Sequence, residues 1–306
     1  MSKLIFFGTP EFAVPILIKI FKSKYLIQCV YTRPPKKSNR GQKITKSKVQ
    51  KISEDLNIHL RTPIQLKENL KEYEFIKNLN PDLGIVVAYG KIIPKKILDL
   101  PKKGFINIHA SILPKYRGAA PIQRSIMNLE KKTGISIMKM TEKLDSGPVY
   151  KKYEIDVKAQ DNFEKLSRDL SNLASENIID NISNIFDGNV QFENQDHSKA
   201  TYADKIKKNE AIIDWNMSAE NILGKINGLY PNPGACFYYN GERYKILEAE
   251  VNDNFGETGF VLKTPLTIGC KNKSIKILKI QRAGKSSQNI DDFIIGSRIR
   301  VGTDLN

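Results

Sequence analysis

The sequence has few of the residues that build metal centres and disulfide frameworks. Its 306 residues include three cysteines, Cys29, Cys236 and Cys270, and only three histidines. The cysteines are odd in number and far apart, so they form neither a zinc-binding spacing nor a disulfide framework. We therefore expect no metal and a reducing, cytoplasmic location.

Long apolar runs and common catalytic motifs are also missing. No stretch reaches the length of a membrane span, and we expect no membrane partner. The apolar N-terminus is interrupted by GTPE at residues 8–11, and no small-residue cleavage site follows, so a signal peptide is not predicted. No serine or cysteine lies in a nucleophile motif such as GxSxG, and no GxGxxG follows the first predicted strand.

Acidic residues are scarce relative to basic ones. The chain has 33 Asp and Glu against 49 Lys and Arg, a net charge of +16 and a pI of about 9.5. This favours an anionic partner such as nucleic acid, although a solvated basic surface gives the same count. The charge is unevenly distributed, because eight basic residues and no acidic one lie between Arg33 and Lys51. A second acid-free run, Lys271–Lys285, contributes six more.

The order of apolar segments predicts an α/β domain followed by a small β domain. Strands separated by helical segments indicate a largely parallel sheet, and a long amphipathic helix is predicted over 161–187. The predicted strands of this part are 3–7, 25–32, 83–90, 105–109, 133–140 and 149–155. Beyond residue 209 a short helix, 219–229, precedes five short strand-like runs with a hairpin signal at Asn240-Gly241.

We therefore predict a Rossmann-like, largely parallel α/β sheet domain followed by a small all-β barrel of the OB type. The predicted boundaries are a catalytic domain over 1–189, a polar linker over 190–208 and a β-barrel domain over 209–306. In an open α/β sheet, ligands bind outside the carboxyl ends of the strands.

Two polar residues stand at such an end, where NIHASILPKYRGAAP (107–121) begins. Alternation places Asn107 and His109 on the same face of their strand. The proline and glycine residues that follow fix an irregular backbone suited to a ligand. Asp145, in the turn LDSGPVY, could orient the imidazole, but spacing alone does not show that it reaches His109. A capped structural histidine and an ordinary turn aspartate remain the alternatives.

An amide and an imidazole side by side suit one class of chemistry. Asn and protonated His donate hydrogen bonds to an oxyanion that develops on a carbonyl. Without a protein nucleophile, this arrangement fits acyl transfer in which the substrates supply both the nucleophile and the carbonyl. The two other histidines, His59 and His197, lack such a setting and are interpreted as structural.

At this point the sequence resembles the methionyl-tRNA formyltransferases, a group within the 10-formyltetrahydrofolate-dependent formyltransferase family. Asn-x-His with the SxLP loop is typical of the whole family, and GTPEFA with the β-domain tail is typical of the tRNA group. The resemblance covers nearly the whole chain, in the segments FFGTPEFAVPIL (6–17), VVAYGKIIP (86–94), INIHASILPKYRGAAPIQRSI (106–126), TGISIMKMTEKLDSGPVY (133–150) and TYADKI…IDW (201–215).

The resemblance implies that the formyl group passes from 10-formyltetrahydrofolate, the co-substrate, to the α-amine of initiator methionyl-tRNA. The N-formylmethionyl-tRNA that results is used in translation initiation. By the same resemblance, Asn107, His109 and Asp145 are catalytic, and VVAYG forms a pterin pocket through its backbone. The folate-binding loop would consist of Ser111, Ile112, Leu113 and Pro114.

The basic segment 33–51 matches an insertion that this family uses on the acceptor stem of tRNA. The implied tRNA contacts are Arg40, Lys36, Lys37 and Lys43, and the β-barrel domain is implied to bind tRNA as well. We expect a monomer. The alternatives are a glycinamide-ribonucleotide formyltransferase, a sugar-nucleotide formyltransferase and, more remotely, a non-catalytic RNA-binding protein.

Overall fold

The chain forms two compact units. The computed structural model describes residues 1–38 and 43–306. Unit 1 comprises Met1–Ala119, Gly134–Ile155 and Ser167–Ala203, and unit 2 comprises Ala120–Thr133, Asp156–Leu166 and Asp204–Asn306. Two segments that precede residue 189 thus group with the C-terminal part of the chain. The domain boundaries predicted at residues 189 and 209 remain a prediction.

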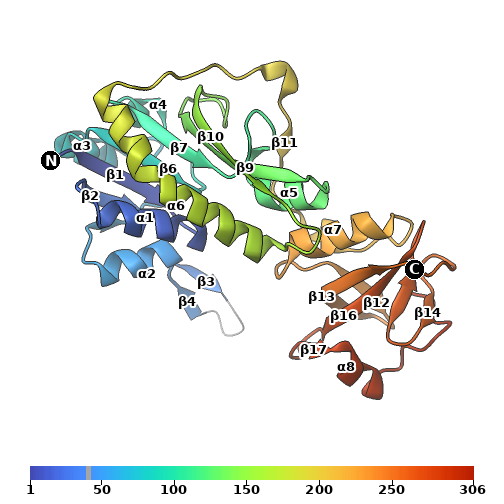
Figure 1. Cartoon of the computed structure of the whole chain (residues 1–306). Helices are drawn as coiled ribbons and strands as arrows, with labels where there is room; N and C mark the ends of the chain where they lie inside the picture. The colour runs from blue at the N-terminus through green and yellow to red at the C-terminus, as the bar shows by residue number, and fades with distance from the viewer. Residues whose placement is uncertain (39–42) are drawn as a thin grey trace. The chain divides into compact units, whose positions relative to one another are not determined.

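A seven-stranded sheet forms the centre of unit 1 (Figure 1). The strand order is β10-β9-β7-β6-β1-β2-β5, with every pair from β7 to β5 parallel and β9 antiparallel to β7. The predicted largely parallel α/β sheet is therefore confirmed. The strands are β1 (Lys3–Gly8), β2 (Leu26–Tyr31), β5 (Leu60–Arg61), β6 (Leu83–Val87), β7 (Phe105–His109), β9 (Lys132–Lys139) and β10 (Val149–Asp156).

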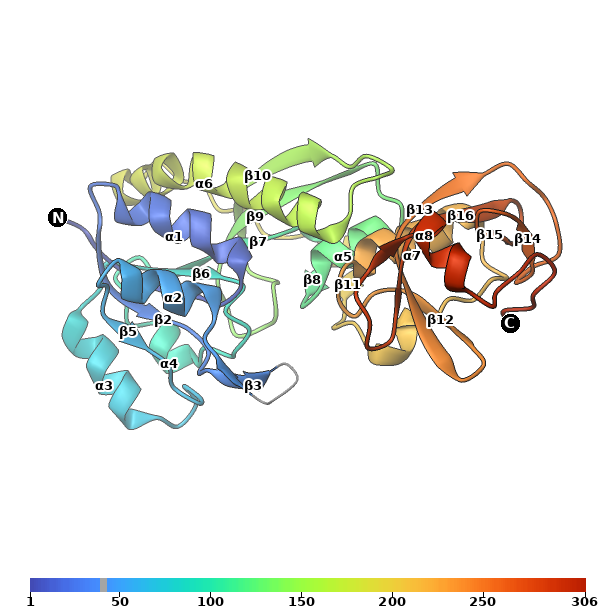
Figure 2. The same ribbon diagram turned by 90° about the horizontal axis from the view of Figure 1, so that it is seen from below.

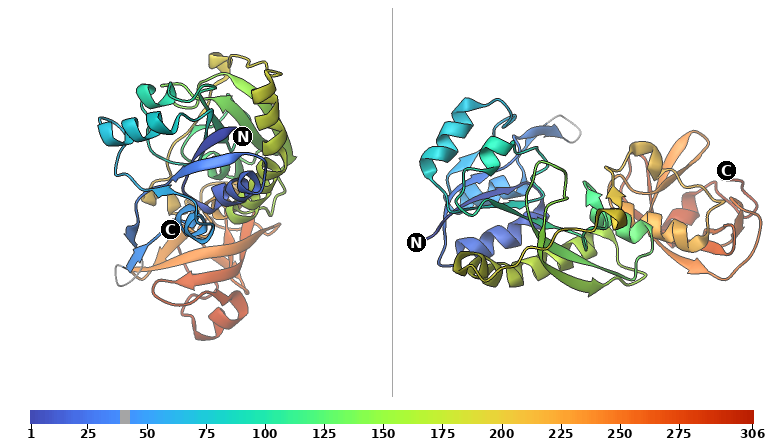
Figure 3. Two further views of the ribbon diagram at one scale, coloured as in Figure 1. Left: turned by 90° about the vertical axis from the view of Figure 1, so that its left-hand side faces the viewer. Right: turned by 90° about the horizontal axis from the view of Figure 1, so that it is seen from above.

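Helices cover both faces of this sheet, which explains why the inner strands β6 and β7 are fully buried rather than alternating. On one face α1 and α6 lie side by side, and Ser171 Oγ donates to the carbonyl of Phe12 at 2.7 Å (Figures 2 and 3). On the other face Phe7 stacks on Tyr31, and both belong to the cluster that contains Ile76 of α3. The helices of this unit are α1 (Val14–Phe21), α2 (Lys48–Asp55), α3 (Leu70–Leu79), α4 (Lys95–Leu98) and α6 (Phe163–Asp187).

The basic segment forms two short strands and then a helix. Strands β3 (Lys36–Ser38) and β4 (Lys43–Thr45) pair antiparallel, and α2 follows Ser47, whose hydroxyl accepts from the N–H of Gln50 at 2.9 Å. The two strands were not predicted from the sequence, because lysine and serine have low strand propensity.

Unit 2 contains an antiparallel sheet of six strands in the order β12-β13-β16-β15-β14, with β17 paired to β16. This confirms the predicted β domain, and the only tryptophan, Trp215, is 2% exposed in its core. The strands are β12 (Cys236–Tyr239), β13 (Glu242–Asn252), β14 (Val261–Lys263), β15 (Thr267–Gly269), β16 (Ser274–Arg282) and β17 (Gln288–Asn289). The helices are α5 (Pro121–Met127), α7 (Ala219–Leu229) and α8 (Ile290–Gly296).

Candidate functional site

Asn107 and His109 lie at the carboxyl end of β7, in the middle of the sheet. Strand β6 pairs with Asn107 on one side, while on the other side β9 places Ser136 opposite His109. Asn107 is 9% exposed and His109 is 6% exposed, so both are polar groups in a nearly closed apolar setting. Buried polar groups need partners, and these two have a common one.

Asp145 is that common partner. The Asn107 amide nitrogen Nδ2 donates to Asp145 Oδ1 at 3.4 Å, and His109 Nδ1 lies 3.7 Å from Asp145 Oδ2. The N–H of Gly118 donates to Oδ2 at 2.9 Å. The turn after β9 therefore brings the three predicted catalytic residues together, although Asp145 lies 36 positions beyond His109.

The imidazole is held from both sides. His109 Nε2 lies 2.9 Å from the carbonyl oxygen of Tyr116. A carbonyl only accepts hydrogen bonds, so Nε2 carries a hydrogen, and Nδ1 is the nitrogen that faces Asp145. The ring orientation is thus fixed before any substrate binds, which is what a group that polarises a carbonyl needs.

The loop 111–114 is anchored by a serine of the neighbouring strand. Ser136 Oγ donates to the carbonyl of Ser111 at 2.7 Å and accepts from the N–H of Leu113 at 3.0 Å. Ser111 and Leu113 are both buried, while Ile112 and Pro114 are partly exposed. Sequence reasoning missed Ser136, although a serine inside the apolar run GISIM was a signal that could have found it.

A second loop is fixed at the end of β6. The carbonyl of Tyr89 accepts from Thr9 Oγ1 at 2.9 Å and from Arg33 Nε at 3.1 Å, and Arg33 Nη2 donates to the carbonyl of Gly90. Ala88 has a φ of 48°, a left-handed conformation that the surrounding hydrogen bonds maintain. Arg33, the first of the basic segment's residues, therefore supports the predicted pterin loop.

The other basic residues of 33–51 differ in their exposure and in their ion pairs. Lys36 is exposed on β3, whereas Lys46 pairs with Glu54 at 2.8 Å and Lys48 with Glu11 at 3.3 Å. Lys37 and Lys43 lie opposite Ile44 and Ser38 in the two-stranded pairing. Arg40, the predicted contact near the tRNA end, lies outside the described residues.

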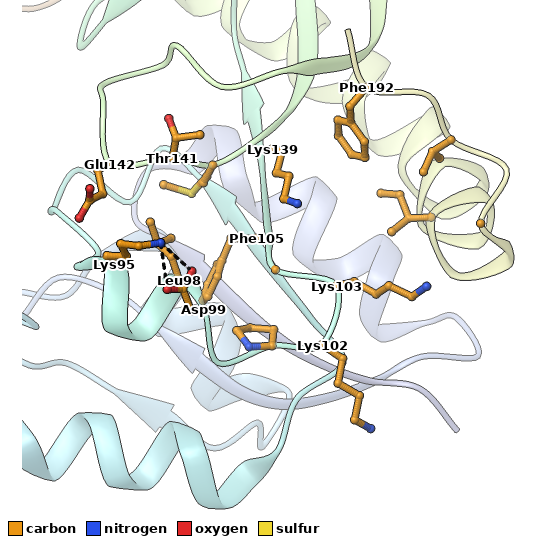
Figure 4. A pocket seen from close by; sticks show the side chains of 16 residues that line it. Lys95, Leu98, Asp99, Lys102, Lys103, Phe105, Lys139, Thr141, Glu142 and Phe192 are labelled. Carbon is orange, nitrogen blue, oxygen red and sulfur yellow. Dashed lines mark hydrogen bonds and ion pairs between the residues drawn. The ribbon is translucent and has the colours of Figure 1, made fainter. Parts of the chain in front are cut away.

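A cavity of about 730 Å³ lies at the opposite end of the same sheet (Figure 4). Its lining includes Lys103 and Phe105 at the start of β7 and Lys139 at the end of β9, together with Lys95, which pairs with Asp99 at 3.1 Å. None of the predicted site residues that the structure describes lines it. The predicted catalytic and folate-binding residues lie at the other end of the strand.

Within residues 1–38 and 43–306, no group of three or more His, Cys, Asp or Glu side chains could hold a metal ion. In the same described residues, no helix is long and apolar enough to cross a membrane.

Known families and proteins resemble both parts of the chain. A family model described as formyl transferase matches residues 2–182, and one described as formyl transferase, C-terminal domain, matches residues 205–298. A methionyl-tRNA formyltransferase of Pelagibacter ubique is 60% identical over 303 residues, which cover 99% of this chain and 98% of that protein. One of Caldanaerobacter subterraneus is 40% identical, with 99% of each chain covered. The solved methionyl-tRNA formyltransferase of Clostridium thermocellum shares the fold, with a TM-score of 0.58 and 22% identity over 82% of this chain and 93% of that one.

Proposed function

This chain belongs to the formyl transferase family and, within it, to the methionyl-tRNA formyltransferases, and from that premise we propose its reaction. It transfers the formyl group of 10-formyltetrahydrofolate to the α-amine of initiator methionyl-tRNA. The observation that carries the proposal is the meeting of Asn107, His109 and Asp145 at the carboxyl end of β7.

The reaction exchanges one carbon–nitrogen bond for another. The amine nitrogen of methionyl-tRNA forms a bond to the formyl carbon, the bond from that carbon to N10 breaks, and the amine proton ends on N10. Asn107 donates a hydrogen bond to the carbonyl oxygen as charge develops there. His109, beside Asn107, helps to move the proton, while Asp145 faces the imidazole Nδ1.

The residues present fit a folate. A flat heterocycle with alternating donors and acceptors is recognised well by backbone groups of rigid loops. Both candidate loops are rigid, because Arg33 and Thr9 hold 88–90 and Ser136 holds 111–114. They follow the adjacent strands β6 and β7, so the co-substrate would bind beside Asn107 and His109. The folate-contacting residues are then Ser111, Ile112, Leu113 and Pro114.

The basic segment supplies the affinity for tRNA. Lys36, Lys37, Arg40 and Lys43 contact phosphates, which gives binding that weakens with salt but does not read sequence. Lys46 and Lys48 already have carboxylate partners and contribute less. The protein acts as a cytoplasmic monomer.

The test is to replace His109 and to measure turnover and tRNA binding separately. In His109→Ala, kcat for formylation of methionyl-tRNA should fall by about 100-fold or more, because the group that moves the proton is lost. The Kd for the same tRNA should stay within about twofold of wild type, since the ring is buried and touches Asp145 and Tyr116.

The matched control is His59→Ala. His59 is an exposed histidine that stacks on Phe75 at 5.4 Å, and its removal should leave kcat unchanged. Full turnover by His109→Ala would contradict the assignment. An equal loss of tRNA binding in that variant would contradict it as well.

A further inference from the structure

Gln195 holds the turn that carries Asp145. It lies between α6 and the 3-10 turn His197–Lys199 and is 8% exposed. Its amide nitrogen Nε2 donates to the carbonyl of Asp145 at 2.9 Å and to that of Gly147 at 2.7 Å. Both amide hydrogens are therefore used on one turn.

The other end of the same amide faces Arg117. The Oε1 atom of Gln195 accepts from Arg117 Nε at 3.0 Å and from Arg117 Nη2 at 2.7 Å. Arg117 is 3% exposed, and its Nη2 also lies 3.0 Å from His197 Nδ1. A charged donor makes a strong hydrogen bond, and it polarises the amide so that Nε2 becomes a better donor.

The orientation of the Gln195 amide follows from its partners. A guanidinium group can only donate, and a carbonyl can only accept. Oxygen must therefore face Arg117 and nitrogen must face the carbonyls of Asp145 and Gly147. An amide satisfies both ends at once, whereas a carboxylate would satisfy only the first.

Asp145 needs such support because its backbone is strained. Its φ is 46°, in the left-handed region, which is unfavourable for a residue other than glycine. Its carboxylate is held separately by the N–H of Gly118, the residue after Arg117. Arg117 and Gly118 form β8, which pairs with β11 (Tyr202–Ala203). The segment 195–203 thus supports the backbone of Asp145 through Gln195. It also supports the carboxylate, through the pairing of β11 with the strand that contains Gly118.

We propose that Gln195, polarised by Arg117, is a positioning residue that sets the carboxylate of Asp145 against Asn107 and His109. This rests on the proposed function, since the positions matter only if these three residues act on the formyl group. Gln195 touches no substrate, so its effect passes through Asp145. Small displacements of a catalytic group are known to cost large factors in rate.

The first test is Gln195→Glu, assayed for formylation of methionyl-tRNA. The variant keeps an acceptor for Arg117 but places a carboxylate against two carbonyl oxygens. We expect kcat to fall by about 10–100-fold while both KM values stay within about twofold. The control is Gln28→Glu, because Gln28 Nε2 also donates to a backbone carbonyl, that of Leu79 at 3.0 Å, far along the sheet in β2. Its kcat should match wild type, and equal losses in both variants would overturn the proposal.

The second test separates positioning from general stability. In an Asp145→Asn background, Gln195→Glu should cost less than about threefold in kcat, because the group that it positions is already altered. A fully multiplicative loss would overturn the proposal. Amide hydrogen exchange in 141–149 should be faster in Gln195→Glu than in wild type, and unchanged exchange would equally overturn it.

The exchange measurement does not depend on the reaction. If wild type fails to formylate methionyl-tRNA, the proposed function fails, whereas the exchange result still decides whether Gln195 holds the turn. If wild type is active and Gln195→Glu retains full kcat, the positioning role alone fails.

Discussion

At the scale of single residues, Glu72 is a buried carboxylate whose charge unit 1 depends on. It accepts from Arg61 Nε and Nη2, both at 2.6 Å, and from the Tyr31 hydroxyl at 2.9 Å. Burial alone would raise the pKa of Glu72, but the hydrogen bonds from Arg61 and Tyr31 outweigh it and hold that pKa below its usual value. Its contribution to stability is therefore present above the unfolded pKa of about 4.3 and is lost as pH falls through the folded pKa.

We predict that Glu72→Gln lowers the free energy of unfolding by about 3 kcal/mol at pH 7, because Arg61 is left without its counter-charge. The difference from wild type should shrink below about pH 4, where the Glu72 carboxylate of the unfolded chain begins to protonate. Urea unfolding at both pH values measures this. Glu74→Gln on the same helix is the control, since Glu74 and Lys77 form an exposed pair at 3.9 Å. A pH-independent difference would contradict the role of the charge.

Site residues differ in how far the sequence could predict them. Asn107 and His109 follow from alternation and from the rule that ligands bind at the carboxyl ends of strands. Asp145 was a candidate from the turn LDSGPVY, but spacing could not show that it reaches His109, because that contact depends on a left-handed turn. Ser136 and Gln195 act through hydrogen bonds to backbone carbonyls, which leave no spacing pattern in the sequence.

At the scale of elements, the basic residues of 33–51 lie in two different settings. Arg33 supports the loop that follows β6, whereas Lys36 lies on β3. Arg33 lies against the carbonyls of Tyr89 and Gly90, and a Cβ on Gly90 would meet Arg33 Nη2 at 1.9 Å. Only glycine permits this approach, and its φ of 70° also favours glycine. Lys36, three residues later, is exposed.

We predict that Arg33→Lys raises the KM for 10-formyltetrahydrofolate about tenfold, since losing one charge-assisted hydrogen bond costs about 1.5 kcal/mol. The KM for methionyl-tRNA should change by less than about twofold. Lys36→Ala should show the reverse pattern, because an exposed lysine contributes phosphate contacts. Steady-state kinetics with each substrate varied in turn distinguishes the two variants, and identical profiles would refute the division of tasks.

Elements with a clear apolar period were predictable, and short or tightly packed ones were not. The strands of the large sheet and the long helix α6 follow their apolar patterns. The packing of α7 on α5 does not follow from an apolar pattern, because it depends on glycines, which have no side chain, at the contact. A Cβ on Gly224 would lie 2.8 Å from Leu129 Cδ2, and one on Gly228 would lie 2.7 Å from Met127 Cγ. Two glycines four residues apart in α7 were the available signal.

At the scale of the whole molecule, charge and fold carry different information. A net charge of +16 suits a polyanion, and the α/β unit with its antiparallel β companion is the arrangement shared with known formyl transferases. Neither feature selects the acceptor of the formyl group, because a family fold hosts several acceptors. Membership of the methionyl-tRNA formyltransferases, not charge or fold, is what identifies methionyl-tRNA as the acceptor.

The most direct measurement offers three amines at equal concentration to the purified protein with formyl-labelled 10-formyltetrahydrofolate. The amines are initiator methionyl-tRNA, glycinamide ribonucleotide and a nucleotide-linked amino sugar. We expect the label to enter methionyl-tRNA at least about 100-fold faster than either small amine, a difference of about 2.7 kcal/mol in transition-state stabilisation. Faster labelling of a small amine, or no labelling of methionyl-tRNA, would contradict the proposed function.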